Sequence, residues 1–166
     1  MEFILRKFKK GDEESLVANI NNKDIYDRTL RIPYPYTTQD AKDWIAKNEL
    51  EDPTGVGFVI DIDGKVVGGI GISAIQDGEG ELGYWLGEQY WGQGIMSEAV
   101  KQMTEYGFEK LGLQRIYVHV FLFNDASKRV LEKNDYISEG IIKNNTIKDG
   151  KQIDEYRFYK LRDAGK

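Results

Sequence analysis

The chain has 166 residues, 40% of them hydrophobic and 31% charged, which suits one folded domain that buries a core of its own. Its 28 acidic residues outnumber 23 basic ones, and the net charge of −5 disfavours a nucleic-acid-binding protein, because such proteins usually carry a basic excess. The lack of cysteine excludes a disulfide framework, a thiolate metal site and a cysteine nucleophile, and the single histidine, His119, argues against a histidine metal cluster or a Ser-His-Asp triad.

The first ten residues alternate apolar and basic side chains, with Phe3, Leu5 and Phe8 as the apolar members. This alternation predicts a strand over residues 3–9 and lacks the apolar core of an export signal. No apolar run in the chain approaches the roughly 18 residues that span a membrane. We therefore expect a single domain over residues 1–166, located in the cytoplasm, with no bound metal and no membrane partner.

A helix is predicted after this strand. Asp12 can cap it, and it is expected to run to about residue 21. Its buried face would comprise Leu16, Val17 and Ile20. The polar residues 21–24 are expected to break it.

The segment over residues 25–36 is expected to be extended. Two prolines in three residues restrict the backbone at residues 33–35 and bar a helix there. Residues 37–40 (Thr-Thr-Gln-Asp) then match a capping box, which opens a helix through about residue 50. Trp44 and Ile45 are expected to face inward.

A hairpin follows, with strands predicted over residues 57–61 and 65–74. Asp63 and Gly64 between them are a strong two-residue turn signal. Residues 69–74 also match the dinucleotide fingerprint G-x-G-x-x-A, but that motif requires a helix to follow, and residues 77–80 read as a turn. We therefore interpret the segment as strand.

Residues 89–97 lead from a strand into a helix through two glycines. An aromatic-rich strand is predicted over residues 81–86, and a helix from Gly94 to about residue 110. Gly92 and Gly94 allow the backbone to turn sharply and to approach a ligand. The first N–H groups of the helix lack partners and lie at the positive end of its dipole, so phosphate is the expected ligand. The buried helix face would comprise Ile95, Met96, Ala99, Val100, Met103 and Tyr106.

The last third of the chain predicts a strand, a short helix and a hairpin. Their expected ranges are 115–123 for the strand, 126–133 for the helix, and 136–142 and 153–161 for the hairpin strands around a turn at 148–150. His119 lies on the outer side of the first of these strands and is expected to be structural. The predicted order is β-α-α-β-β-β-α-β-α-β-β, an α/β domain with a mixed, mostly antiparallel sheet flanked by helices.

Several of these segments resemble the GNAT superfamily of acyl-CoA-dependent N-acetyltransferases. Gln89, Gly92 and Gly94 match its pyrophosphate-loop pattern Q/R-x-x-G-x-G/A. The sequence is similar to the RimJ/RimL-like branch of ribosomal-protein N-terminal acetyltransferases, which shows E-[IL]-G-Y-W-L before the loop, here residues 81–86, and N-x-x-S after it, here residues 124–127. The resemblance extends over most of the chain and implies a single GNAT-like domain with acetyl-CoA as co-substrate.

The resemblance also implies where acetyl-CoA binds. The pyrophosphate would lie on the turn formed by Gln89, Gly92, Gln93, Gly94, Ile95, Met96 and Ser97. The pantetheine arm would pair with the strand near Trp85 and Leu86, where a free backbone N–H would stabilise the carbonyl oxygen, although the Trp85 side chain would serve equally well as core. Asn124 is expected to bond the pantetheine amide rather than to cap the next helix.

Two side chains are candidates for the chemistry. Glu81 stands where many GNAT enzymes have a glutamate that takes the amine proton, directly or through water, and its alternative is a solvated glutamate at a strand edge. Many members protonate the sulfur with a tyrosine, but Leu131 holds that place here. Ser127 is the branch's alternative, placed to hydrogen-bond the thiolate, unless it only bonds the local backbone.

The acceptor is less defined by the sequence. Tyr34 and Tyr36 resemble a wall of the acceptor site in this branch, although core packing would explain them as well. The resemblance points to a protein or peptide N-terminus, and a polyamine, an aminoglycoside or another small amine remains the alternative. A non-catalytic acyl-CoA-binding protein also remains open, because the usual tyrosine is missing. A monomer and a homodimer through the last hairpin are both compatible with the sequence.

Overall fold

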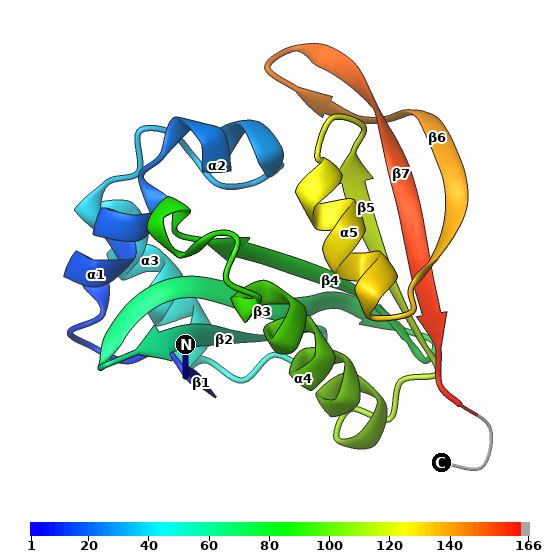
Figure 1. Cartoon of the computed structure of the whole chain (residues 1–166). Coiled ribbons are helices and arrows are strands. Elements are labelled where there is room, and N and C mark those ends of the chain that lie inside the picture. Colours follow the sequence, from blue (N-terminus) through cyan, green and yellow to red (C-terminus); the bar gives the residue numbers. More distant parts are fainter. Residues whose placement is uncertain (164–166) are drawn as a thin grey trace.

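Across residues 1–163, which the computed structural model describes, a seven-stranded sheet runs through the protein with helices on both faces (Figure 1). The strands lie in the order β1-β2-β3-β4-β5-β7-β6, and β4 and β5 are parallel while the other neighbours are antiparallel. The mixed, mostly antiparallel sheet is therefore confirmed. The strands are β1 (Ile4–Arg6), β2 (Val56–Ile62), β3 (Lys65–Gln76), β4 (Glu79–Leu86), β5 (Arg115–Phe121), β6 (Ile137–Lys148) and β7 (Lys151–Leu161).

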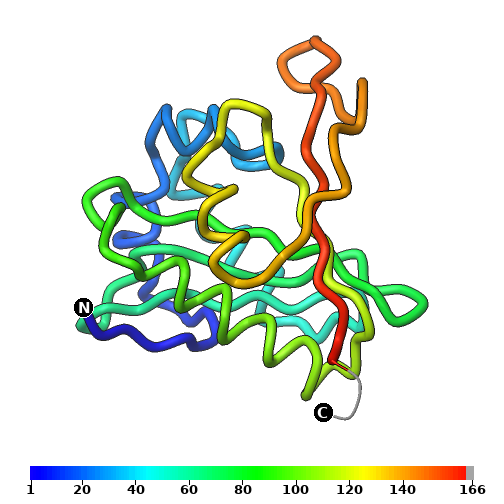
Figure 2. The backbone as a smooth tube through the Cα atoms, turned by 45° about the vertical axis from the view of Figure 1, so that its right-hand side comes forward, coloured from blue at the N-terminus to red at the C-terminus, as the bar shows by residue number. Residues whose placement is uncertain are grey.

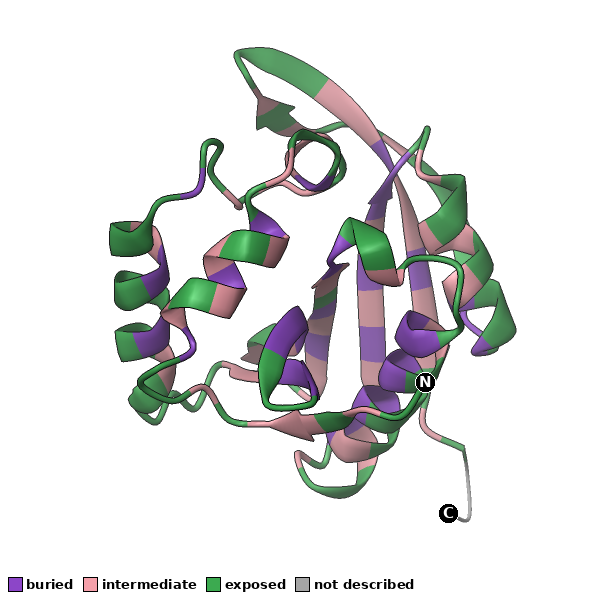
Figure 3. Cartoon of the chain, turned by 60° about the vertical axis from the view of Figure 1, so that its left-hand side comes forward, coloured by how far each residue is buried: buried purple, intermediate pink, exposed green. Residues whose placement is uncertain are grey.

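The helices cover the sheet in two groups, with α1 and α3 on one face and α4 and α5 on the other (Figure 1). They are α1 (Glu13–Ile20), α2 (Lys23–Arg28), α3 (Thr38–Glu49), α4 (Ile95–Glu109) and α5 (Asp125–Lys133), and a single 3-10 turn covers Glu88–Tyr90. Helices and strands alternate buried and outward-facing residues, as Figure 3 shows. Within residues 1–163, no helix is long and apolar enough to cross a membrane.

Helix α2 was not predicted, because the segment that contains it was expected to be extended. Asn22 caps this helix: its side-chain oxygen accepts from the N–H groups of Asp24 and Ile25 at 2.8 and 3.1 Å. The polar residues that were expected only to end α1 therefore also begin a second helix. Ile25 is buried and anchors α2 in the core.

Helix α3 begins as expected, with the reciprocal capping box of Thr37 and Asp40. The expected burial of Ile45 is confirmed, but that of Trp44 is wrong, since 43% of Trp44 is exposed. Consecutive helical residues point about 100° apart, and the buried side is formed by Ala41 and Ile45, four residues apart. Trp44 instead packs edge-on against Phe8, with ring centroids 6.4 Å apart.

Asp12 stands at the N-cap of α1 but makes no side-chain cap bond, which corrects the predicted role. Its carboxylate accepts two hydrogen bonds from the guanidinium of Arg6, at 2.8 and 3.0 Å, and one from the N–H of Lys9. The Nε of Arg6 donates to Asp61 on β2 at 2.6 Å. Asp12 and Asp61 are both buried, so Arg6 balances two buried carboxylates and ties β1, β2 and the start of α1 together.

The predicted turns and the predicted strand at residues 65–74 are confirmed. Asp63 and Gly64 join β2 to β3 with positive φ at both residues, and the segment that matched the dinucleotide fingerprint lies inside β3. Gly112, with φ of 68°, follows the C-terminus of α4, and Asp135 takes a left-handed conformation after α5. These positions require residues that tolerate positive φ, which is why their sequence signals are reliable.

The β6–β7 hairpin extends beyond the rest of the sheet (Figure 2). Its tip reaches α2, where the Nζ of Lys148 donates to the backbone oxygen of Tyr26 at 2.6 Å and to that of Thr29. Tyr26 also hydrogen-bonds Asp149 through its hydroxyl. The tip of the C-terminal hairpin is thus bonded to α2 in the N-terminal part of the chain.

Strands β4 and β5 separate partway along their length. Their pairing is recorded from Glu79 opposite Arg115 to Glu81 opposite Tyr117, whereas β4 continues to pair with β3 as far as Leu86. Among residues 1–163, no strand therefore pairs with this edge of β4 beyond Glu81. This gap positions the candidate site.

Candidate active site

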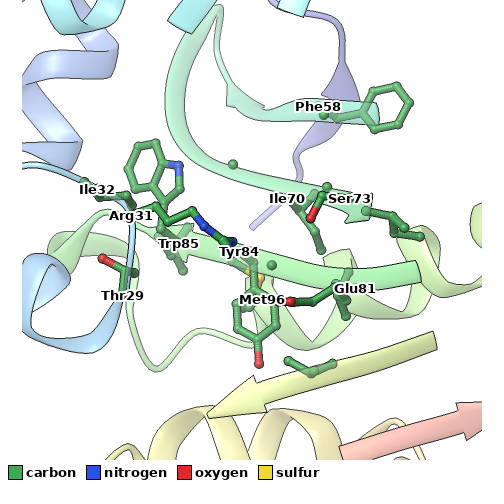
Figure 4. Close-up of a pocket in the computed structure, with 18 of the residues that line it drawn as sticks. Thr29, Arg31, Ile32, Phe58, Ile70, Ser73, Glu81, Tyr84, Trp85 and Met96 are labelled. Atoms are coloured by element: carbon green, nitrogen blue, oxygen red, sulfur yellow. The ribbon is translucent and has the colours of Figure 1, made fainter. Parts of the chain in front are cut away.

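An open cleft of about 2100 Å³ lies along the gap between β4 and β5. Figure 4 shows side chains from several elements converging on it. The predicted site residues that line the cleft are Tyr36, Glu81, Trp85, Leu86, Gly92, Gln93, Gly94, Ile95, Met96, Ser97, Asn124 and Ser127. Gln89 and Tyr34 are not among its lining residues.

The turn at the start of α4 has the shape that an anion requires. Gly92 and Gly94 have φ of 73° and 79°, and Gly94 is the N-cap residue without a side-chain cap. A Cβ built on either glycine would meet no atom of the described residues within 4 Å, so the space beside the backbone is open. The backbone N–H groups that begin α4 can therefore approach a phosphate closely, and the turn fits the pyrophosphate of acetyl-CoA.

The other predicted residues of this turn are divided between the core and the cleft. The side chains of Ile95 and Met96 are buried, so these residues can contact a ligand through the backbone. The carbonyl of Ser97 accepts from Asn134 of the α5 C-terminus at 3.0 Å, which holds α4 against α5. The side chain of Gln89 donates instead to Asn19 on α1, at 3.2 Å and outside the cleft.

The free edge of β4 provides backbone donors. The N–H of Gly87 donates to Val67 on β3 at 2.8 Å. Because successive N–H groups of a strand alternate in direction, those of Leu86 and Tyr84 point away from β3 and into the gap. The carbonyl of Leu86 accepts from the indole N–H of Trp91 at 2.7 Å, which fixes the end of the strand.

Glu81, Gly83 and Trp85 share one face of β4, as the alternation predicted. They pair across to Ser73, Gly71 and Gly69 of β3. The Trp85 indole lies directly over Gly69, where an added Cβ would be 2.5 Å from its Nε1. Trp85 also packs with the core on the α1–α3 side, and by the same alternation its backbone N–H points toward β3, so Leu86 and Tyr84 rather than Trp85 offer backbone donors to the gap.

Glu81 is half-buried beside His119 of β5, with Oε1 3.4 Å from the imidazole Nδ1. The hydrogen bond with His119 lowers the pKa of the Glu81 carboxyl, and the nearby charge of Arg31 acts in the same direction. Glu81 is therefore ionised at neutral pH. His119 lines the same cleft.

Ser127 lies at the N-terminus of α5, and its Oγ is 2.5 Å from the hydroxyl of Tyr84 on β4. Its N–H donates to the side chain of Asn124 at 3.3 Å, so Asn124 caps α5, contrary to the expectation that it would not. Asn124 also lines the cleft. Leu131, at the place of the usual tyrosine, is fully buried in the core.

The two tyrosines of the proposed acceptor wall lie in different environments. Tyr36 is buried and lines the cleft, and burial raises the pKa of its phenol to about 12. Tyr34 is 46% exposed and packs against Tyr26, with ring centroids 5.9 Å apart. Of the pair, Tyr36 borders the cleft.

Three residues of the site were not found from the sequence: Tyr84, His119 and Arg31. Strand alternation predicts that Tyr84 lies on the face of β4 opposite Glu81. It does not predict which helix the Tyr84 hydroxyl contacts. His119 follows Tyr117 by two residues, and Tyr117 pairs with Glu81, so the β4–β5 register would have revealed the contact. Arg31 lies in a loop, where no periodic signal exists.

Known proteins similar to this chain indicate its family. The profile of the acetyltransferase (GNAT) domain matches residues 2–137. The uncharacterized N-acetyltransferase p20 of Bacillus licheniformis is 29% identical over 95% of this chain and 92% of its own length. The probable N-acetyltransferase YjcK of Bacillus subtilis is 30% identical over 83% of this chain and 81% of its own. A ribosomal-protein-serine acetyltransferase of Escherichia coli is 27% identical over 74% and 71%.

Solved structures show the same fold. RimL, a ribosomal L7/L12 alpha-N-protein acetyltransferase in complex with coenzyme A, superposes with a TM-score of 0.85 at 24% identity, over 98% of this chain and 99% of that one. Spermidine N-acetyltransferase from Vibrio cholerae, in complex with CoA and spermine, gives a TM-score of 0.80 at 22% identity, over 96% and 95%. With its domain profile, its cleft and its glycine turn, this chain belongs to the GNAT family of acetyl-CoA-dependent N-acetyltransferases.

Proposed function

We propose that this N-acetyltransferase moves an acetyl group from acetyl-CoA to the α-amine of a protein or peptide N-terminus, by direct attack of the amine on the thioester. In this proposal, the turn of residues 92–97 binds the pyrophosphate. The N–H of Leu86 and the amide of Asn124 hold the pantetheine arm. Glu81 faces the acceptor amine from one side of the gap, and Ser127 faces the sulfur from the other.

The lowered pKa of Glu81 carries the choice of acceptor. A carboxyl that ionises readily is a weak base, so Glu81 attracts an ammonium group but removes its proton with little driving force. A lysine side chain, with pKa of about 10.4, is only roughly 0.1% neutral near pH 7.4, whereas an α-amine at about 7.7–8.0 is roughly 20–30% neutral. A site with a weak base is better matched to the α-amine.

The relatives include both kinds of acceptor. The names of the Escherichia coli ribosomal-protein-serine acetyltransferase and of RimL agree with a protein N-terminus. The Vibrio cholerae spermidine enzyme has the same fold, so a polyamine is the second candidate.

The proposal predicts that a short peptide with serine, alanine or threonine first and an internal lysine is acetylated at its α-amine. Mass spectrometry of the fragmented product locates the acetyl group. A matched peptide with a blocked N-terminus should be acetylated at least about tenfold more slowly, because its remaining amine is almost entirely protonated. Acetyl found mainly on the lysine, or turnover only with spermidine, contradicts the proposal.

Glu81→Gln is predicted to lower kcat by about 10–100-fold and to move the rising limb of its pH profile toward lower pH. A carboxylate raises the pKa of a bound ammonium, so its removal lets the amine lose its proton at lower pH. Glu79→Gln is the matched control, because Glu79 lies two residues earlier on β4 and outside the cleft. Equal kcat profiles for both variants would remove Glu81 from the reaction.

A further inference from the structure

A hydrogen bond crosses the cleft beside the free edge of β4 and joins β4 to α5. Tyr84 comes from the free edge of β4, and Ser127 from the first turn of α5. Their hydroxyl oxygens are 2.5 Å apart, and both residues line the cleft. Figure 4 shows the Tyr84 ring pointing across the gap, on the opposite side of β4 from the Trp85 indole.

Either hydroxyl can donate at this distance, and the surroundings of the phenol favour Tyr84 as the donor. Burial raises the pKa of the Tyr84 phenol to about 12, so it keeps its proton throughout the physiological range. Within residues 1–163, the recorded partner of this phenol is Ser127. A buried phenolic proton needs an acceptor, and the lone pairs of Ser127 Oγ provide it. The proton of Ser127 is then free to point elsewhere in the cleft.

We propose that Tyr84 is a positioning residue for acetyl transfer: by donating to Ser127 Oγ, it directs the Ser127 hydroxyl proton toward the sulfur of the thioester. The inference rests on the proposed role of Ser127. It also supplies a tyrosine hydroxyl from β4 where Leu131 leaves none on α5.

The proton and electron balance is simple. The amine nitrogen forms a bond to the carbonyl carbon, the C–S bond breaks, and its electron pair stays on the sulfur. The Ser127 hydroxyl donates a hydrogen bond to this thiolate, and the surplus proton of the amine passes by way of Glu81 to solvent. Tyr84 keeps its own proton because an ordinary thiol, with pKa of about 8.5, is a much stronger acid than this phenol.

The first test measures the pKa of the CoA thiol in the product complex, and it needs no acceptor. Proton release on CoA binding is measured by calorimetry at several pH values in buffers of different ionisation enthalpy, with desulfo-CoA as the ligand that lacks the thiol. Two hydroxyls in series stabilise the thiolate, so the pKa of the bound thiol is expected to rise by about one unit in Tyr84→Phe and in Ser127→Ala. An unchanged thiol pKa in Tyr84→Phe overturns the inference.

The second test separates positioning from structural support. Tyr84→Phe and Ser127→Ala are each expected to lower kcat about tenfold with a KM for acetyl-CoA within about twofold of wild type. The double variant should be no slower than Ser127→Ala, because Tyr84 acts through Ser127. Effects that multiply in the double variant contradict that dependence.

Tyr136→Phe is the matched control. Tyr136 is a buried tyrosine whose hydroxyl bonds Thr104 at 2.7 Å, and it lies outside the lining of the cleft. It should lose stability, measured by thermal unfolding, and keep wild-type kcat and thiol pKa. If Tyr84→Phe behaves in the same way, its hydroxyl serves the fold alone. Failure of the peptide assay with a shifted thiol pKa would reject the α-amine acceptor and leave the role of Tyr84 intact.

Discussion

Replacement of Gly94 by valine is expected to abolish acetyl-CoA binding while the protein remains folded. Gly94 has φ of 79°, which a β-branched residue adopts only with strain. The new side chain would project into the open space beside the N-terminus of α4, where the pyrophosphate is proposed to lie. We expect CoA affinity, measured by calorimetry, to fall roughly a hundredfold or more, which corresponds to about 3 kcal/mol.

Gly112→Val is the control for the strain of this substitution. Gly112 follows the other end of the same helix, has φ of 68°, and also has nothing within 4 Å of an added Cβ. Gly112 does not line the cleft. Both variants should therefore lose similar stability in thermal unfolding, and only Gly94→Val should lose CoA. Wild-type affinity in Gly94→Val would exclude the turn as the pyrophosphate site.

Arg6→Met is expected to destabilise the fold by roughly 3–5 kcal/mol, the range for removing one partner of a buried ion pair. Arg6 is the shared donor to Asp12 and Asp61, and both carboxylates are buried. Without the guanidinium, two negative charges remain inside the protein with fewer partners. Denaturant unfolding at neutral pH measures the loss.

Lowering the pH should reduce the difference in the free energy of unfolding between wild type and Arg6→Met. Burial is the largest single influence on the Asp12 carboxyl and raises its pKa, but the hydrogen bonds from Arg6 and from the Lys9 N–H, together with the charges of these two residues, outweigh it and leave the pKa below the ordinary value of 3.8. A carboxyl whose pKa is lowered by folding stabilises the fold at pH values above its pKa in the unfolded state. This stabilisation is lost as the pH falls through its pKa in the folded state. In the variant, burial dominates and raises the pKa of Asp12, so its carboxyl takes up a proton already above the ordinary value of 3.8, and this protonation relieves the destabilisation as the pH falls.

Arg115→Met is the control for this stability prediction. Arg115 also bridges two carboxylates, Glu79 and Glu139, but their side chains are 41% and 33% exposed, far more than those of Asp12 and Asp61. Its loss should change stability by about 1 kcal/mol or less, because water solvates the carboxylates that remain. If Arg6→Met and Arg115→Met lose the same free energy of unfolding, burial of Asp12 and Asp61 does not explain the contribution of Arg6 to stability.

The local features that the sequence predicted correctly depend on near neighbours in the chain. The capping box of Thr37, the hairpin turn at Asp63 and Gly64, and the glycine turn before α4 each involve backbone angles or hydrogen bonds within a few residues. Such features are decided by sterics and short-range bonding, so the residue types carry most of the information. The order of elements along the chain, apart from α2, and the buried face of α4, apart from the partly buried Tyr106, followed in the same way from periodicity.

What the sequence missed depends on residues that are far apart in the chain. The sequence predicts Asp12 as a helix cap, but its carboxylate bonds Arg6, which also bonds Asp61. It predicts Trp44 in the core, but Ala41 and Ile45 form the buried side of α3. A side chain makes the bond that lowers its free energy most, and distant partners are absent from any local pattern.

The candidate site shows the same division. The sequence by itself determined the glycine turn, the carboxylate at Glu81 and the hydroxyl at Ser127, because each lies in a short recognisable segment. Only the tertiary structure decided that β4 leaves β5 after Glu81, that His119 lies beside that carboxylate, and that Tyr84 reaches Ser127 from the opposite wall. These contacts join residues 38 and 43 positions apart, and they arise from the packing of strands and helices, which no local propensity encodes.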